Sequence, residues 1–311
     1  APGVEPFWAY AGKTGIGTSY EQYQNGQYSD SAATGDVSKV WFSIAKGMIT
    51  ETMFGLIHQA QIKDMQFIVT GNDFTVTEAD DLDVSIDYLY KDDQGRPLSL
   101  AYKVTSTDKQ GRFSLEKHIF TDPDTQTLFV RSVFNTQLEG LKAYVNVNPY
   151  INNNGLGDFA KTTDQGLVAW EGDNYLTLQS SSPFKAKTVG FTGESDGISS
   201  LKTTQAINNQ YTNTGEVSGN VNMLAELGDI SNNTTFDLAL SFGKTQQQSI
   251  QQGEQSLAKG YQAVLDHYNG KGDALGWQDY LQSLKPLNTM TEQTADNGKL
   301  LYTSAMVLKA Q

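Results

Sequence analysis

Carboxylate side chains are the groups in this chain best suited to acid–base chemistry. The 311 residues include 35 Asp and Glu residues. Catalysis by paired carboxylates needs two acids held across a substrate, one of them with a raised pKa. Turns and strand starts explain the most prominent acids, which are Asp92, Asp93, Asp108, Asp122 and Asp124 in turns and Asp80, Asp81 and Asp83 before a strand. The sequence therefore singles out no catalytic pair.

Metal, phosphate and nucleophile motifs are also missing from the sequence. His58, His118 and His267 are far apart and form no H-x-x-x-H pattern, and the chain has no cysteine. The acidic segment 78–83 lacks the glycine and the ligand spacing of a calcium loop. No G-K-[ST] follows the glycines at 15 and 17, and G-x-S-x-G does not occur. We therefore predict no metal and no cofactor, and we expect His267 to favour the end of a helix just before Gly270.

Composition excludes several classes of partner. The formal net charge is −13, and the 22 Lys and Arg residues are scattered, so neither nucleic acid nor an anionic membrane is an expected partner. No run of about eighteen apolar residues is present to span a bilayer. The start at Ala1-Pro2-Gly3 without Met is typical of a processed terminus. These features, with abundant Asn, Gln, Ser, Thr and Tyr, favour an exported bacterial protein that handles polar, neutral ligands.

Sugar binding fits this composition. Aromatic rings pack on pyranose faces, and amide side chains hydrogen-bond hydroxyl groups. Composition alone does not place such a site. We expect the four tryptophans, Trp8, Trp41, Trp170 and Trp277, to serve packing or interfaces rather than a binding platform.

Residues 37–244 have the pattern of β-hairpins. Apolar and polar residues alternate over 84–90 and again over 98–104, and the turn Asp92-Asp93-Gln94-Gly95 separates them. Turn signals recur every ten to fifteen residues or so, which is typical of a sandwich or barrel. Further strands are predicted over 113–120, 128–134, 143–147, 166–170, 175–180, 187–190, 220–227 and 235–242. So many strands predict a mainly β fold, with two large antiparallel sheets packed face to face in residues 1–245.

Residues 246–311 have a helical rhythm instead. Ile250, Leu257, Tyr261, Val264, Leu265 and Tyr268 predict one helical face that Gly270 closes. Asp273 is expected to cap a second helix, which carries Trp277 and which Pro286 stops. A third helix carries the apolar stripe Leu300, Leu301, Ala305 and Leu308 and reaches Gln311 without a glycine cap. We expect this stripe to face a partner, so that residues 246–311 form a connector to a further domain.

Three stretches resemble the N-terminal domain of bacterial glucoamylases and glucodextranases, in glycoside hydrolase family 15. The first comprises Gly15-Ile16-Gly17-Thr18-Ser19, segment 38–51 and Asp64-Met65-Gln66-Phe67-Ile68-Val69-Thr70. The second comprises segment 147–158, Ser181-Ser182-Pro183-Phe184 and segment 190–197. The third comprises Gly276-Trp277-Gln278-Asp279-Tyr280-Leu281 and segment 301–310. Together they cover nearly the whole chain in the family's order.

The resemblance implies a large β-sandwich and a helical linker, followed by an (α/α)6 catalytic barrel that this chain lacks. Such barrels release glucose from the non-reducing ends of α-glucans or maltooligosaccharides with inversion. A glutamate acid and a glutamate base, both in the barrel, carry out that reaction. No residue here inherits either role, so we expect the chain alone to be inactive. The linker is expected to end in the first helix of the barrel.

The resemblance also points to the loop after the second strand, on the side that faces the barrel in the family. Here this loop corresponds to segment 54–64, and the residues that we expect at the substrate entrance or against the barrel are Phe54, His58, Gln59 and Lys63. The chain departs from the family pattern at two positions. Gly55 replaces the usual Pro, and His58 replaces the usual Asp.

Two other functions stay open. A free-standing carbohydrate-binding or adhesin-like sandwich would bind α-glucan by itself, whereas a scaffold domain would expose an apolar patch meant for its partner. An active sandwich enzyme would need acids or histidines with perturbed pKa values converging in one pocket. The scaffold domain of a glucan hydrolase is the interpretation that the sequence favours.

Overall fold

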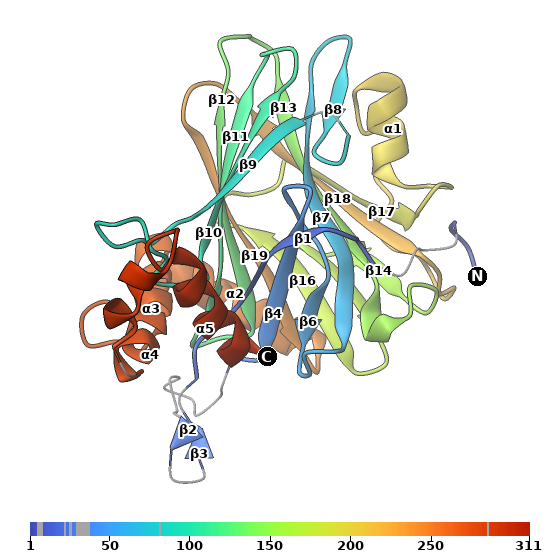
Figure 1. The fold of residues 1–311 in the computed structure, drawn as a ribbon. Coiled ribbons are helices and arrows are strands. Elements are labelled where there is room, and N and C mark those ends of the chain that lie inside the picture. Colours follow the sequence, from blue (N-terminus) through green and yellow to red (C-terminus); the bar gives the residue numbers. More distant parts are fainter. Residues whose placement is uncertain (5–8, 22, 25–26, 29–37, 81, 285) are drawn as a thin grey trace.

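Two antiparallel sheets packed face to face make up most of the computed structural model, which describes residues 1–4, 9–21, 23–24, 27–28, 38–80, 82–284 and 286–311 (Figure 1). Trp8 and Asp81 lie outside the described residues. One sheet contains β1 (Lys13–Thr18), β4 (Val40–Ala45), β5 (Met48–Ile49), β6 (Thr52–Phe54), β7 (Ala60–Thr70), β8 (Thr75–Thr77), β13 (Lys142–Pro149), β17 (Ala186–Phe191) and β18 (Val221–Asp229). The other contains β9 (Leu82–Tyr88), β10 (Tyr102–Asp108), β11 (Ser114–Asp122), β12 (Thr127–Asn135), β14 (Phe159–Thr162), β15 (Leu167–Glu171), β16 (Asn174–Ser180) and β19 (Thr234–Gly243). A separate hairpin joins β2 (Tyr23–Gln24) to β3 (Gln27–Tyr28).

The predicted fold class is confirmed, and the alternation of side chains explains it. In β13, Ala143, Val145 and Val147 join the core between the sheets, because successive residues of a strand point to opposite faces. Tyr144 belongs instead to a small cluster on the outer face, beneath α1 (Gly197–Thr204). The sheets thus form one continuous apolar core with limited apolar packing outside it.

The predicted hairpin between β9 and β10 exists, but its connection is longer than expected. Tyr88 pairs with Tyr102, and Gly95 closes the predicted turn with φ of 78° and an N–H that donates to Asp92 O at 3.0 Å. Leu98 and Leu100 were predicted in the returning strand, yet both precede it. The carbonyl of Leu100 accepts a hydrogen bond from the Tyr268 hydroxyl at 2.9 Å, so a helix rather than a strand satisfies this backbone group.

One charged pair lies inside the sandwich. The Lys117 ammonium of β11 donates to Glu78 Oε2 and to the carbonyl of Gly47, and the two side chains are 0% and 2% exposed. The other Glu78 oxygen accepts the Phe67 N–H at 2.6 Å. This pair links the two sheets through their shared core, whereas the sequence placed Glu78 in an ordinary acidic segment before a strand.

The helical segment over residues 246–311 begins just after the end of β19, and it differs from the prediction at its first helix. The helices are α2 (Gln246–Lys259), α3 (Tyr261–Asn269), α4 (Trp277–Ser283) and α5 (Lys299–Ala310), with short 3₁₀ turns at η1 (Ile151–Asn153), η2 (Leu287–Thr289) and η3 (Thr291–Gln293). The expected single helix over 250–268 breaks at Gly260, whose φ of 86° and ψ of 161° are not helical. As predicted, Gly270 closes α3, and its N–H donates to the carbonyl of His267.

The cap of α4 differs from the prediction as well. The N-cap of α4 is Gly276, and its N–H donates to the Asp279 side chain at 2.8 Å. Asp273 therefore does not cap this helix. Helices α3, α4 and α5 gather on one side of the sandwich, and α1 lies on the opposite side (Figure 1). None of the helices in the described residues combines the length and the apolar character needed to cross a membrane.

A histidine fixes α3 to the sheet. His118 Nδ1 of β11 lies 2.6 Å from the Tyr261 hydroxyl, and Nε2 lies 3.3 Å from Glu116 Oε2. Burial lowers the pKa of His118 and raises the pKa of Tyr261 to about 12. The imidazole is therefore neutral near pH 7, and the Tyr261 hydroxyl donates to Nδ1. Protonation of the ring would remove this acceptor.

This arrangement predicts a specific pH dependence. A native pKa below the unfolded value of about 6.5 means that the unfolded chain binds this proton more tightly. The free energy of unfolding should therefore fall as pH drops from about 6.5 to the native pKa of His118, and the contribution should then level off. Urea unfolding of the wild type and of His118→Gln across this range tests it. The difference between the two proteins should change with pH, and a constant difference would contradict the assignment.

Candidate functional site

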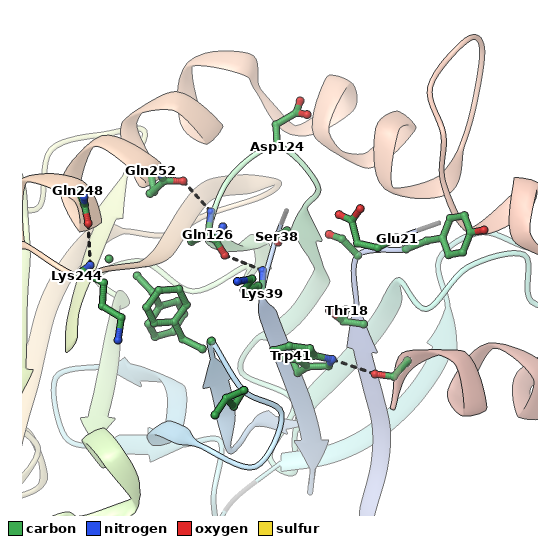
Figure 2. Close-up of a pocket in the computed structure, with 18 of the residues that line it drawn as sticks. Thr18, Glu21, Ser38, Lys39, Trp41, Asp124, Gln126, Lys244, Gln248 and Gln252 are labelled. Atoms are coloured by element: carbon green, nitrogen blue, oxygen red, sulfur yellow. Dashed lines mark hydrogen bonds between the residues drawn. The ribbon is translucent and has the colours of Figure 1, made fainter. Parts of the chain in front are cut away.

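A groove with a cavity volume of about 1170 Å³ lies at one end of the sandwich, between α2 and the strands β4 and β6 (Figure 2). Its lining comes from segments far apart in the sequence. Glutamines of α2 form one wall, and the half-buried Trp41 contributes aromatic surface opposite them. Phe54 and Phe242 lie behind that surface, at 8% and 0% exposed. Ala310, the last residue of α5, and Gln311 after it also line the groove.

Four glutamines of α2 follow a helical spacing and all line the groove. They are Gln248, Gln251, Gln252 and Gln255, at i, i+3, i+4 and i+7. A neighbouring face of α2 carries the buried small residues Ser249, Gly253 and Ser256. A side chain at Gly253 would collide with Gln179, since an added Cβ would lie 2.0 Å from Gln179 Oε1. This close packing on the sheet fixes the direction in which the glutamines point.

Side chain to backbone hydrogen bonds hold the groove in shape (Figure 2). Gln252 Oε1 accepts the Gln126 N–H at 2.8 Å, and Gln126 Oε1 accepts the Lys39 N–H at 2.7 Å. Gln248 Oε1 accepts the N–H of Lys244 at 2.9 Å. These bonds join α2 to the ends of β19 and β12 and to the start of β4. The groove is therefore a formed feature of the fold.

The aromatic wall is packed behind this lining. Phe54 stacks on Phe242 with ring centroids 5.5 Å apart and an interplanar angle of 15°. Trp41 is half-buried, and its indole N–H donates to the carbonyl of Ala310 at 3.0 Å. Leu56 adds an exposed apolar side chain, of which 54% is accessible. The groove thus presents aromatic and apolar surface opposite a row of amides.

The carboxylates among the described groove residues are Glu21 and Asp124. Burial disfavours the ionised form of Asp124, but hydrogen bonds from His267 and Lys259 outweigh it and lower its pKa. A general acid in glycoside hydrolysis needs a raised pKa instead. Asp124 is therefore unsuited to that role. Within the described part of the chain, no cluster of three or more acids and histidines could hold a metal ion.

Of the four loop residues singled out from the sequence, Phe54 alone lines the groove. His58 is exposed in the turn between β6 and β7, and its carbonyl accepts the Asn153 side chain at 2.9 Å. Gln59 Nε2 donates to Asn152 Oδ1 at 3.1 Å. Lys63 is only 7% exposed within β7, and burial lowers its pKa.

The loop at 55–59 is held by an unusual backbone. Asn152 and Asn153 have φ of 58° and 57°, a left-handed backbone conformation that residues other than Gly adopt rarely. Their side chains hydrogen-bond the 55–59 loop and the N–H of Ala60, which stabilises this conformation. These hydrogen bonds therefore rigidify the predicted loop.

Helix α5 turns two apolar faces in different directions. Tyr302, Met306 and Ala310 are buried against the sandwich, whereas Leu300 and Leu308 are 68% and 76% exposed. The other members of the predicted stripe, Leu301 and Ala305, are half-buried. The sequence did not distinguish the first face, which attaches α5 to this domain.

Two of the described tryptophans have the packing roles expected of them. Trp277 is 0% exposed, and its N–H donates to Thr18 O at 2.8 Å. Trp170 stacks between Phe159 and Tyr175 on the sheet. Trp41, by contrast, belongs to the groove. The sequence did show the glutamine-rich segment 246–252, but no local signal linked it to Trp41 or Gln126.

A family model and two known proteins match this chain along most or all of its length. The family model described as glucodextranase, domain N, matches residues 1–282. A glucoamylase of Clostridium sp. (strain G0005) is 30% identical over 318 aligned residues, which cover 99% of this chain and 40% of that protein. The crystal structure of a bacterial glucoamylase complexed with acarbose superposes with a TM-score of 0.82 and 27% identity, over 100% of this chain and 42% of the other. The chain thus spans about two fifths of the length of either relative. It belongs to the glucodextranase domain N family.

Proposed function

We propose that this chain is the non-catalytic N-terminal scaffold domain of an exo-acting α-glucan hydrolase, which releases glucose from non-reducing ends with inversion. The observation that carries the proposal is the match of the whole chain to 40% of a glucoamylase. The domain comprises the sandwich, residues 1–245, and the connector, residues 246–311. The catalytic glutamates would then lie in an (α/α)6 barrel beyond this chain. We further propose that the protein is exported.

Helix α5 is the proposed contact with that barrel. The stripe Leu300, Leu301, Ala305 and Leu308 lies opposite the face that α5 buries in the sandwich. Leu300 and Leu308 are the two most exposed large apolar residues of the described chain. Burying both would stabilise the domain pair by about 1.5 to 3 kcal/mol per leucine.

The loop at 54–59 is proposed to shape substrate access from the same end of the sandwich. Phe54 and Leu56 border the groove that α5 also reaches. His58 is exposed beside them, and Gln59 is tied to the rigid Asn152 turn. Lys63 lies below this surface, within β7, and would support the loop rather than contact the substrate.

A charge placed on the proposed contact tests the scaffold role. In the full-length protein, Leu300→Asp with Leu308→Asp should lower the temperature at which glucose release is lost, because two carboxylates would have to be buried at the domain contact. A shift of several degrees is expected. Leu138→Asp is the matched control, since Leu138 is 46% exposed on the sandwich, away from α5. Equal behaviour of the double variant and the control would contradict the proposed contact.

A further inference from the structure

We infer that the glutamine-lined groove binds a single α-glucan chain on this domain itself. The inference rests on the proposed function only for the choice of α-glucan as the sugar. The site is the groove between α2 and the strands β4 and β6, and its ligand groups are amides on one side and aromatic and apolar surface on the other.

Two of the groove amides are available to a ligand. Gln248 and Gln252 use their side chain oxygens to hold the backbone of Lys244 and Gln126. No hydrogen bond between the side chain of Gln251 or Gln255 and another described residue is present, although both line the groove. An amide offers two donor hydrogens and an acceptor oxygen, which match the paired hydroxyl groups of a pyranose ring. About one helical turn separates these two side chains, so they would hydrogen-bond successive parts of an extended ligand.

The wall opposite the glutamines suits the apolar faces of a sugar ring. Pyranose rings have apolar C–H faces that pack on aromatic and aliphatic side chains. Leu56, of which 54% is exposed, and the half-buried Trp41 supply such surface, whereas Phe54 is only 8% exposed and backs this wall from its stack on Phe242. Pockets that combine apolar walls with a few positioned polar groups are the usual form of small-molecule sites, at about 300–1,000 Å³. A groove of about 1170 Å³ is larger and has room for several sugar units.

Charge favours a neutral ligand. Lys39, Lys244 and Lys309 line the groove together with Glu21 and Asp124, so opposite charges nearly balance. The Lys244 ammonium donates to Asn174 Oδ1 at 2.7 Å, and that of Lys309 lies 5.9 Å from the centre of the Tyr20 ring. The whole chain carries a formal net charge of −13, which repels anionic ligands. An uncharged oligosaccharide fits this field better than a phosphorylated or acidic one.

Calorimetric titration of this 311-residue chain with maltoheptaose tests the inference. Binding to the wild type is expected, and Gln251→Ala with Gln255→Ala should weaken it by about tenfold, because each amide loses its hydrogen bonds to the sugar. Gln247→Ala is the matched control, since Gln247 is exposed on the same helix but does not line the groove. It should bind like the wild type. These exposed positions leave the packed face of α2 intact, so folding is not at issue.

Three results would overturn the inference. They are no heat of binding for the wild type up to about 10 mM sugar, equal affinity of the double variant and the wild type, and equal affinity for a β-linked cello-oligosaccharide of similar length. Glucose release by the full-length protein separates this inference from the proposed function. Glucose release by the full-length protein without sugar binding to this chain would refute binding in the groove and leave the scaffold role intact. Sugar binding to this chain without glucose release by the full-length protein would support the groove and contradict the proposed function.

Discussion

Replacing Lys117 with methionine is expected to lower the free energy of unfolding by about 3 to 5 kcal/mol. Lys117 and Glu78 are buried together between the two sheets, and removal of the ammonium leaves a carboxylate without its counter-charge in an apolar core. The retained hydrogen bond from the Phe67 N–H does not neutralise that charge. Urea unfolding monitored by fluorescence measures the effect. A loss below about 1 kcal/mol would contradict the buried ion pair.

The double variant Glu78→Gln with Lys117→Met is the control for this experiment. Glutamine keeps an oxygen for the Phe67 N–H and carries no charge, so most of the lost stability should return. A second check uses pH. Burial raises the pKa of Glu78, and without Lys117 its protonation becomes easier still. The Lys117→Met defect should therefore be smaller at about pH 4 than at about pH 7, because a neutral Glu78 is cheaper to bury.

Truncation of Trp277 to alanine is expected to destabilise the protein by about 3 to 5 kcal/mol and to loosen the helical connector. Trp277 is the largest fully buried side chain among the described residues, and it packs 5.6 Å from Tyr20 and 5.8 Å from Tyr280, measured between ring centroids. Its N–H donates to the carbonyl of Thr18. One side chain thus attaches α4 to β1, 259 residues away in the sequence.

Urea unfolding and hydrogen exchange of segment 261–311 measure both effects. Trp277→Phe should cost less, because it keeps most of the ring packing and loses the hydrogen bond to Thr18. Trp170→Ala is the comparison on the half-buried sheet surface, and it should leave exchange in the connector unchanged. Wild-type protection of 261–311 in Trp277→Ala would show that the connector does not depend on this anchor.

Local patterns predicted the strands well. The β11–β12 pair could be predicted because alternation of apolar residues and the Asp122-Pro123-Asp124 turn are both encoded within about twenty residues. The prediction of a single helix over 250–268 was wrong, and the reason is also local. Gly260 was tolerated within the helical pattern, but its backbone takes a conformation that ends α2 and starts α3.

Features that depend on distant segments could not be predicted. Both faces of α5 are apolar, so periodicity alone did not show that Tyr302, Met306 and Ala310 would be buried. The buried ion pair of Lys117 could not be predicted, because its partner Glu78 lies 39 positions away in the sequence. The glutamine spacing in α2 was visible, yet the opposite wall of the groove comes from residues about two hundred positions earlier. Only the packing of α2 on the sheet brings the two walls together.

Glucose release from maltoheptaose is the most direct test of the scaffold role. It should be measured for this 311-residue chain and for the full-length protein at equal molar concentration. The account predicts release by the full-length protein and none by the chain alone, because both catalytic carboxyls would lie in the barrel. Release of glucose by the chain alone would contradict it and would direct attention to the carboxylates of the sandwich.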